Sequence, residues 1–398
     1  MVVRPKIFSF FAGSGFLDLG FETSGYDIVY VNEVFAPFIA AHRYSRENLN
    51  LPLPEYGYSE GEDADVNNLV EQGNYLKQLV KDSRKTSIVG FIGGPPCPDF
   101  SVGGKNRGNL GDNGKLSAAY VELICQQQPD FFLFENVKGL WKTKKHRLFY
   151  ESLKTRLQES GYILTDHLIN AIEYGVPQDR ERIILLGFHC NFLSNIGVLI
   201  KGITLNTQLK FPWQKYIIYP QDVVFSYPWI QCEPFQENSI SACPQEIPHE
   251  LTVESWFINN DVSNHPNSKH YFQPRAGIEK FASIPEGDDS RKSFKRLHRW
   301  RYSPTACYGN NEVHLHPYKV RRISAAEALA IQSLPKSFIL PDNMSLTNMF
   351  KTIGNGVPYL ASKAIAESIL DFINQPSLCN TSKFSTVYKQ LELSLNMV

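Results

Sequence analysis

One cysteine of this 398-residue chain lies where a side chain could be aimed at a substrate. Cys97 stands in GGPPCPDFS, directly after the apolar run SIVGFIGG, and its neighbours include Pro95, Pro96 and Pro98. Proline fixes the backbone angle φ and cannot donate to a helix or a sheet ladder, so these neighbours form a rigid frame. A glycine-rich stretch follows, which suits a loop that closes over a substrate. We therefore interpret Cys97 as a candidate nucleophile.

The other cysteines have no comparable setting. A lone cysteine is most often a buried structural residue, and we interpret six in this way: Cys125, Cys190, Cys232, Cys243, Cys307 and Cys379. An odd total of seven, without C-x-x-C spacing, argues against a disulfide framework and against a zinc site. We expect no bound metal and a reducing, cytoplasmic location.

A carboxylate and two arginines lie at the borders of other apolar runs. Glu135 is in FFLFENV, and Arg180 and Arg182 are in QDRERIILLG. A carboxylate at the end of a buried strand is costly unless it is paired or used, and a salt bridge with a nearby arginine is the simpler interpretation. The two-residue spacing points both arginines the same way if their strand begins early. A cysteine, a carboxylate and arginines converging from three strand ends indicate a reaction site.

The segments that must position these residues alternate between strand and helix. Short apolar runs rich in β-branched and aromatic residues predict strands at 6–11, 27–33, 87–94, 131–137 and 182–188. Between them lie helical patterns such as HRLFYESLKTRLQESG, where Gly161 can close the C-terminus. This alternation predicts an α/β fold with a doubly wound, mostly parallel sheet, whose ligands bind at the carboxyl ends of the strands.

A glycine-rich turn joins the first expected strand to a helix. Gly13 and Gly15 allow a tight turn and a close approach of the backbone to a ligand at the helix N-terminus. Asp18 stands where the third glycine of a dinucleotide-binding motif would be, which argues against a pyrophosphate. Glu33 closes the second strand, where it can accept hydrogen bonds from ribose hydroxyls. The pattern favours a nucleoside-type cofactor, with a merely tight strand–helix junction as the alternative.

Net charge is zero, and no apolar run approaches the roughly 18 residues of a membrane span. The stretch SRKSFKRLHRWRY is strongly basic and interleaved with aromatic side chains. Such a stripe is typical of a surface that faces phosphates, and a solvated basic face is the alternative. Its basic residues are Arg291, Lys292, Lys295, Arg296, Arg299 and Arg301.

The second half of the chain has a different texture. From about Cys190 to Pro317 prolines, aromatics and polar residues dominate, which indicates a separate, smaller domain that is irregular or β-rich. Helical order returns with a capping-box spacing at Ser324 and Glu327. A last amphipathic helix lies within VPYLASKAIAESILDFI. We expect four regions: a catalytic and cofactor-binding domain at 1–189, a recognition domain at 190–322, returning helices at 323–375 and a peripheral tail at 376–398.

Several motifs occur in a fixed order along residues 6–188 and 318–373. They are FAGSGFLDLGFE, VNE, GGPPCPDFS, FENVKGL, QDRERIILLG, RRISAAEALAIQSLP and IGNGVPYL. In this order they resemble the DNA cytosine-5 methyltransferases that use S-adenosylmethionine and release S-adenosylhomocysteine. The resemblance implies a large catalytic domain and a small target-recognition domain with double-stranded DNA in the cleft between them. It also implies that the final helix returns to pack beside the first motif.

The resemblance assigns roles to the residues singled out above. Cys97 attacks C6 of a flipped-out cytosine, Glu135 holds N3 and the amino group, and Arg182, less directly Arg180, orients the base through O2. The cofactor-contacting positions are Phe11, Gly13, Gly15, Glu33, Asp65, Pro96, Asn355 and Val357. Ser101 joins the basic residues as a DNA contact. The setting implied is a monomeric modification enzyme that protects a bacterial genome against a partner endonuclease encoded nearby.

Departures from the family pattern leave points open. Pro98 replaces the usual glutamine, and Phe16 replaces a common glycine and is expected to tighten the methionine side of the cofactor pocket. Either Asp65 or Asp63 reads the adenine. A tRNA cytosine-5 methyltransferase of the same fold is the nearest alternative, and the long segment between the motifs favours DNA. A DNA-binding regulator with an inactive site and a dinucleotide oxidoreductase are further alternatives.

Overall fold

A computed structural model gives the arrangement of most of the chain. The described residues are 4–96, 112–198, 209–274, 278–291, 293–306, 308 and 312–375. The predicted site residues Cys97, Ser101 and Lys292 lie outside them, as does Pro98.

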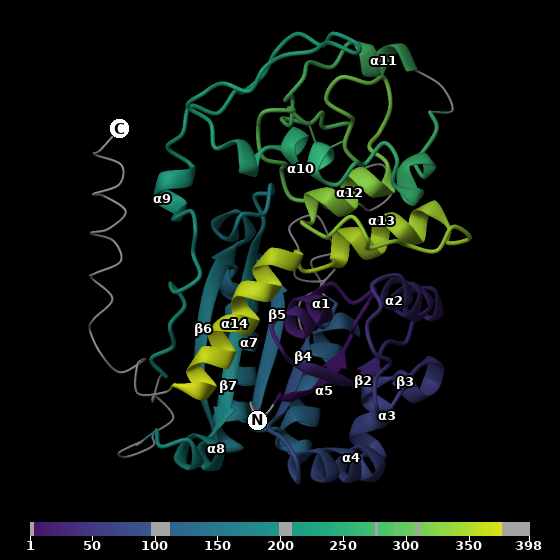
Figure 1. The fold of residues 1–398 in the computed structure, drawn as a ribbon. Helices are drawn as coiled ribbons and strands as arrows, with labels where there is room; N and C mark the ends of the chain where they lie inside the picture. The colour runs from purple at the N-terminus through teal and green to yellow at the C-terminus, as the bar shows by residue number, and fades with distance from the viewer. Residues whose placement is uncertain are drawn as a thin grey trace.

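A seven-stranded sheet forms the centre of the lower lobe in Figure 1. Its strands are β1 (Lys6–Phe10), β2 (Asp27–Asn32), β3 (Tyr58–Ser59), β4 (Val89–Gly93), β5 (Phe131–Val137), β6 (Tyr162–Asn170) and β7 (Glu181–His189). The spatial order is β3-β2-β1-β4-β5-β7-β6. The strands from β3 to β5 pair in parallel, whereas β7 is antiparallel to both of its neighbours. The predicted mostly parallel sheet is confirmed, with β3 and β6 as strands that the pattern did not predict.

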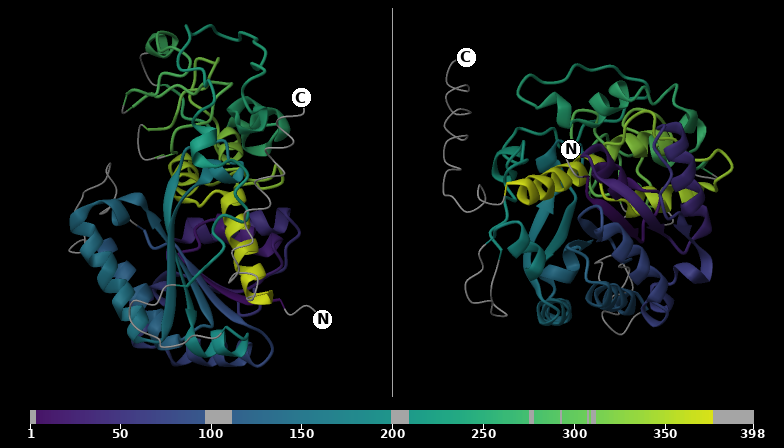
Figure 2. Two further views of the ribbon diagram at one scale, coloured as in Figure 1. Left: turned by 90° about the vertical axis from the view of Figure 1, so that its left-hand side faces the viewer. Right: turned by 60° about the horizontal axis from the view of Figure 1, so that its bottom comes forward.

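Helices cover both faces of the sheet. The helices of this lobe are α1 (Phe16–Thr23), α2 (Ala36–Asn48), α3 (Val66–Glu71), α4 (Asn74–Arg84), α5 (Asp112–Gln127), α6 (Lys138–Lys142), α7 (Lys144–Glu159), α8 (Cys190–Asn195) and α14 (Tyr359–Asn374). Side chains alternate between the faces along β1, so that Ile7 belongs to one core cluster and Phe8 and Phe10 to the other. Figure 2 shows α14 on one side of the strands and the α5 region on the other.

The last helix of the lobe packs against the first. Gly20 of α1 makes this possible, because a Cβ there would lie 2.4 Å from the Ser362 Cβ of α14. Tyr26, buried at the start of β2, donates its hydroxyl to the carbonyl of Ala366 at 2.8 Å. A segment more than 300 residues away in sequence therefore completes the layer that covers β1 and β2.

A second lobe, which contains the helices from α9 to α13, lies above the sheet in Figure 1. Its helices are α9 (Gln221–Val224), α10 (Val253–Asn259), α11 (Ile278–Ala282), α12 (Ala325–Ile331) and α13 (Leu346–Asn355). In its described part, strand pairing is limited to isolated bridges such as that of Glu233 with Glu286. The described part of this lobe is irregular, which is one of the two alternatives that the sequence left open. The capping box is confirmed, because Ser324 accepts from the N–H of Glu327 and Glu327 accepts from the N–H of Ser324.

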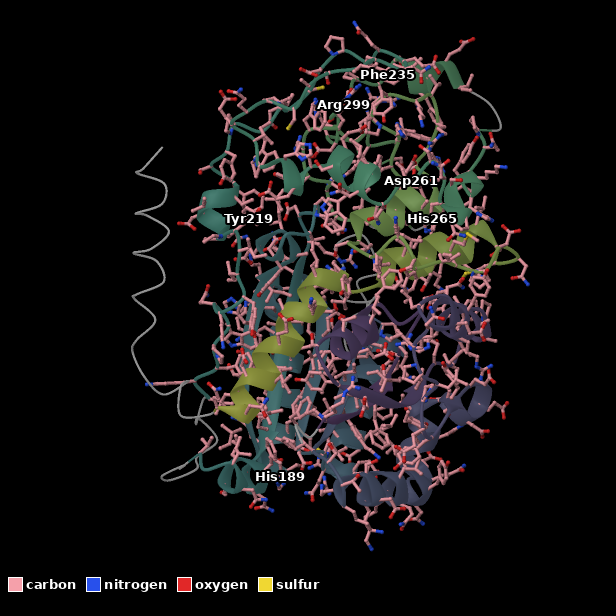
Figure 3. The ribbon with its side chains drawn as sticks, viewed as in Figure 1. His189, Tyr219, Phe235, Asp261, His265 and Arg299 are labelled. Carbon is pink, nitrogen blue, oxygen red and sulfur yellow. The ribbon has the colours of Figure 1, made fainter. Side chains whose placement is uncertain are left out.

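Figure 3 shows how far the two lobes extend, with Arg299 and Phe235 in the upper lobe and His189 near the foot of the sheet. Within the described ranges, no helix is long and apolar enough to cross a membrane.

Candidate active site

The centre of the candidate site is an ion pair between two strands. Glu135 near the end of β5 and Arg182 near the start of β7 lie 3.0 Å apart, measured from Oε1 to Nε. Because β7 runs antiparallel, its amino end meets the carboxyl end of β5 at the same edge of the sheet. Burial raises the pKa of the Glu135 carboxyl, and the nearby charges of Arg182 and Arg180 oppose this shift. The site therefore holds a carboxyl group that takes up a proton more readily than one in water.

The loop that leads to Cys97 begins directly against this pair. A Cβ at Gly94, the residue after β4, would lie only 2.6 Å from Oε2 of Glu135. Pro95 is buried and Pro96 is exposed where the described part of the loop ends. Glycine at position 94 is thus what allows the chain to pass beside the Glu135 carboxyl.

Arg180 does not share the setting of Arg182. It precedes β7 and is fully buried. Its guanidinium donates to the main-chain carbonyls of Ala306 at 3.0 Å, Gly354 at 2.7 Å and Gly356 at 3.1 Å. Arg182 thus pairs with Glu135, whereas Arg180 binds the end of α13 and the residue after it. Because β7 begins only at Glu181, the early start of the strand that would point both arginines the same way is not observed.

The glycine turn between β1 and α1 has the backbone conformation that its sequence predicts. Phe11, Gly13 and Gly15 have φ values of 52°, 58° and 83°, a region that non-glycine residues adopt rarely. Glu33, which follows β2, accepts from the N–H of Gly13 at 3.0 Å and from that of Phe35 at 2.8 Å. Burial raises the pKa of Glu33, and the hydrogen bonds from these two N–H groups partly offset this rise. Glu33 therefore fixes the turn as well as lying at the end of its strand.

A buried charged cluster lies under this turn, and sequence reasoning missed most of it. Asp18, at the position that argued against a dinucleotide, accepts from the hydroxyl of Ser9 at 2.6 Å and pairs with Nε2 of His42 at 2.9 Å. A Cβ at Gly15 would lie 2.5 Å from Nη1 of Arg46 and 2.7 Å from Cδ2 of His42. The turn therefore rests on these two side chains. The spacing of four that relates His42 to Arg46 is the signal that would have placed both on one face of α2.

The pKa values in this cluster follow from burial and from the arginine. Burial and the charge of Arg46 lower the pKa of His42 to about 4. Burial raises the pKa of Glu22, which pairs with Arg46 at 2.7 Å, to about 7. His42 is thus a neutral ring near pH 7 and donates Nε2–H to the Asp18 carboxylate.

The remaining residues expected at the cofactor lie on separate elements. Asp65 is half-buried at the start of α3 and accepts from the N–H of Asn67 at 2.9 Å, while Asp63 is exposed. Asn355 is exposed at the C-terminal end of α13 and Val357 is buried. The hydroxyls of Ser14 and Thr352, 2.8 Å apart, join α13 to the glycine turn. Whether Asp65 or Asp63 reads an adenine stays a prediction.

Phe16 is accommodated within a core cluster. Its ring is buried and meets Phe338 edge-on, with ring centroids 5.1 Å apart. A Cβ at Gly356 would lie 2.2 Å from the ring. The space that a glycine at position 16 would leave is filled by apolar contact with the α12–α13 region. The ring therefore packs into the core, and the expected tightening of the cofactor pocket stays a prediction.

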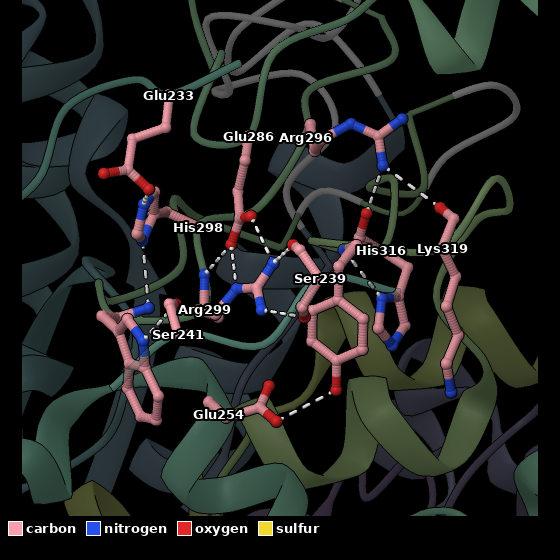
Figure 4. Close-up of polar contacts among 12 residues, drawn as sticks. Glu233, Ser239, Ser241, Glu254, Glu286, Arg296, His298, Arg299, His316 and Lys319 are labelled. Carbon is pink, nitrogen blue, oxygen red and sulfur yellow. Dashed lines mark hydrogen bonds and ion pairs between the residues drawn. The ribbon is translucent and has the colours of Figure 1, made fainter. Parts of the chain in front are cut away.

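The basic stretch divides into buried and accessible residues. Arg296 is fully buried and donates to the carbonyls of Ile284 and His316. Arg299 is buried and forms an ion pair with Glu286 at 2.8 Å (Figure 4). The prediction of a phosphate contact is therefore wrong for Arg296 and Arg299, which hold the irregular lobe together.

Three of the other basic residues are at least partly accessible, so their role as DNA contacts stays a prediction. Arg291 is exposed and pairs with Asp288 at 3.4 Å. Arg301 pairs with Asp289 at 3.0 Å, and Lys295 is half-buried. A screened pair at the surface leaves an arginine able to exchange its partner for a phosphate.

Comparisons with known proteins agree with this architecture. A family model described as C-5 cytosine-specific DNA methylase matches residues 5–371. The chain is 56% identical over 371 residues to the Type II methyltransferase M.NmeDI of Neisseria meningitidis serogroup C, with 93% of this chain and 84% of the relative covered. It is 36% identical over 391 residues to the Type II methyltransferase M.XorII of Xanthomonas oryzae pv. oryzae, with 93% and 85% covered.

Solved structures share the fold at lower identity. A putative DNA modification methyltransferase encoded within a prophage of E. coli has a TM-score of 0.61 and 21% identity, with 93% of this chain and 99% of that chain covered. The S. pombe Dnmt2 methyltransferase has a TM-score of 0.53 and 13% identity, with 94% and 99% covered. Because the family model matches nearly the whole sequence, this chain belongs to the C-5 cytosine-specific DNA methylase family.

Proposed function

We propose that the protein transfers a methyl group from S-adenosylmethionine to C5 of a flipped-out cytosine in a specific double-stranded DNA sequence. The observation that carries the proposal is the Glu135–Arg182 pair, held 3.0 Å apart beside the start of the Cys97 loop. Membership of the family and the identity to M.NmeDI support a role in a type II restriction–modification system. The modification would protect host DNA from a partner endonuclease.

The side chains at this edge of the sheet have the chemistry that the reaction needs. C5 of cytosine is a poor nucleophile, and addition of the Cys97 thiolate at C6 gives it enamine character. Glu135, whose pKa is raised by burial, donates a proton to N3 as the thiolate adds. Arg182 orients the base through O2 while it holds Glu135. After transfer, loss of the C5 proton and elimination of Cys97 release 5-methylcytosine.

The residues at the glycine turn fit an S-adenosyl cofactor. That group supplies an electrophilic methyl carried on a sulfonium. Glu33 keeps acceptor capacity for ribose hydroxyls, because Oε2 accepts from Gly13, Oε1 accepts from Phe35, and a carboxylate oxygen can accept more than one hydrogen bond. No side chain of the described residues caps the N-terminus of α1, whose first N–H groups can bind a carboxylate. Phe11, Pro96, Asn355 and Val357 complete the proposed site.

The proposed division of the chain follows the lobes. Residues 1–189 supply catalysis and cofactor binding, residues 190–322 read the DNA, and the hinge and C-terminal helices at 323–375 return to the first domain. A duplex cannot expose C6 to a thiolate, so the target base must leave the stack at a cost of a few kcal/mol. Arg291, Lys295 and Arg301 are proposed phosphate contacts because they remain at least partly accessible.

Methyl transfer from labelled S-adenosylmethionine to duplex DNA and to tRNA tests the proposal directly. We expect label in DNA, and bisulfite sequencing of DNA from cells that express the protein would then reveal the target sequence. Label in tRNA alone would replace the proposed substrate, and no label in either would refute the activity.

The nucleophile has its own test. Cys97→Ala is expected to abolish methyl transfer and covalent trapping on DNA that contains 5-fluorocytosine, while it retains some DNA binding. Turnover by this variant at the wild-type rate would show that Cys97 is not the nucleophile.

A further inference from the structure

The hydrogen bonds of Arg180 place it between the two halves of the proposed site. Its Nη2 donates to the carbonyls of Gly354 and Gly356 at 2.7 and 3.1 Å. These two carbonyls flank Asn355, a proposed cofactor contact. Two residues along the chain from Arg180, Arg182 pairs with Glu135, the proposed base contact. We call residues 354–356 the cofactor turn. Arg180, which binds this turn, is therefore only two residues from Arg182, which holds the proposed base contact.

Two buried glutamines extend this clamp into the second lobe. Gln178 accepts from the N–H of Ala306 at 3.0 Å and donates to Oε1 of Gln332 at 3.2 Å. Gln332, at the end of α12, donates in turn to the carbonyl of Ile353 in the last turn of α13. Both glutamines are fully buried. The start of β7, the end of α12 and the end of α13 are therefore joined by one polar network.

The network is rigid for physical reasons. A buried guanidinium is costly unless its donors are satisfied, and the two Nη groups of Arg180 meet this demand with three main-chain carbonyls from two distant segments. The planar fork of arginine fixes the direction of each bond, which a lysine ammonium does not. Movement of the turn at residues 354–356 would break these bonds inside the protein, where no water replaces them.

We infer that Arg180, together with Gln178 and Gln332, is a positioning residue that holds the cofactor-facing turn in register with the Glu135–Arg182 pair. The inference rests on the proposed methyl transfer and assigns Arg180 a different part from the base contact that its sequence position implies. Arg182 helps to bind the base, whereas Arg180 keeps the methyl donor aligned with the bound base. Misplacement of reacting groups by about 1 Å costs on the order of 100-fold in rate.

Two reactions of the same enzyme distinguish the role of Arg180 from that of Arg182. Without cofactor, the Cys97 thiolate forms a bond to C6, and C5 takes up a proton from water. Loss of the original C5 hydrogen and cleavage of the C–S bond then restore the base. Release of tritium from DNA labelled at cytosine C5 measures this cycle, which needs the base site alone. Transfer of labelled methyl groups to the same DNA needs the base site and the cofactor turn together.

We expect Arg180→Lys and Gln332→Met to lower methyl transfer about 100-fold and to raise the KM for S-adenosylmethionine. Tritium release without cofactor should stay within about threefold of the wild-type rate. This is less than the tenfold change that corresponds to 1.4 kcal/mol. Arg182→Lys is the matched control, since it lies in the base site and should lower both reactions together.

Tritium release that falls in proportion to transfer in Arg180→Lys would overturn the inference and return Arg180 to the base. Unchanged transfer in both variants would also overturn it. Gln332→Met keeps the test available if Arg180→Lys does not fold, which a thermal melt of each variant establishes. Wild-type enzyme that neither transfers methyl groups nor releases tritium would instead refute the proposed function.

Discussion

At the scale of single residues, the candidate site depends on the absence of a side chain at Gly94 as much as on the presence of Glu135. The carboxyl of Glu135 occupies the place where a side chain at position 94 would begin. The same carboxyl is held by Arg182 from the neighbouring strand. The strands β4, β5 and β7 therefore meet in one small volume, which leaves no room for a side chain at position 94.

Gly94→Ala should lower kcat/KM for methyl transfer by about 100-fold, because the new Cβ would lie 2.6 Å from Glu135 Oε2 and force that carboxyl away. Steady-state kinetics on DNA measure the change. Gly73→Ala is a matched control, since Gly73 has an ordinary φ of −58° and its new Cβ would meet chiefly the flexible end of Gln127. Equal activity in the two variants would contradict the proposed place of Glu135 in the reaction.

At the scale of elements, α1 and the turn after α13 are fitted to each other by one ring and one glycine. Phe16 fills the space in which Gly356 lacks a side chain. The local sequence around each residue does not account for its type. The contact between the two segments, which lie 340 residues apart in sequence, does. A substitution at either position must therefore be judged together with the other.

Gly356→Ala should lower the free energy of unfolding by about 1–3 kcal/mol through overpacking against Phe16. In the Phe16→Ala background the same change should cost much less, which gives a coupling energy of about 1–3 kcal/mol in a double-mutant cycle. Denaturant unfolding of the four proteins measures it. Additive effects would mean that the ring moves aside at no cost.

The start of α12 is a second element with a calculable dependence on pH. Glu327 is buried, caps the helix, and pairs with Arg321 at 2.6 Å and His316 at 3.4 Å. Burial acts to raise the pKa of Glu327, but the charges and hydrogen bonds of His316 and Arg321 outweigh burial and lower it well below its ordinary value of 4.5. Its stabilising contribution is therefore complete above about pH 4.5 and is lost as the pH falls.

Glu327→Gln should cost about 3 kcal/mol of unfolding free energy at pH 7, because it leaves the largely buried guanidinium of Arg321 without its carboxylate. The difference from the wild type should shrink as the pH is lowered below 4.5, where the wild-type group begins to protonate in the unfolded state. Urea unfolding at a series of pH values checks both statements. A difference that stays constant down to pH 2 would show that the carboxylate is not the stabilising form.

At the scale of the whole molecule, buried neutral histidines in both lobes make the fold sensitive to mild acid. Burial lowers the pKa of His42 to about 4 and that of His314 to about 3. The ordinary value in an unfolded chain is 6.5. At these two rings the unfolded state therefore binds protons below pH 6.5 that the folded state does not, and their contribution to stability is lost as the pH falls from 6.5 towards 4.

His42 and His314 together should lower the free energy of unfolding by a few kcal/mol between pH 6.5 and 4.5, and Glu22, whose pKa burial raises to about 7, should offset part of this fall because the folded state takes up its proton first. Thermal melts across this range measure the change. His314→Gln should reduce the slope, because it removes one group that must lose its proton on folding. A profile of His314→Gln with the same slope as the wild type would contradict the neutral, buried state of this ring.

The sequence by itself determined the fold class and the edge of the sheet at which the candidate site lies. Apolar runs that alternate with helical patterns predict parallel strands, and Glu135 marks where one of those strands ends. The left-handed turn at Gly13 and Gly15 was equally readable, because only glycine adopts it without strain. These properties are local, so neighbours in sequence are enough to specify them.

Only the tertiary structure decided the direction of β7 and the partners of the arginines. Arg180 and Arg182 belong to the same short motif, yet they have different partners. Arg182 pairs with Glu135, whereas Arg180 binds carbonyls of a segment 174 residues away. One basic stretch holds Arg291 at the surface and Arg299 in a buried ion pair. A charged side chain has the same local preferences in either setting, and its role is set by partners that folding brings from elsewhere in the chain.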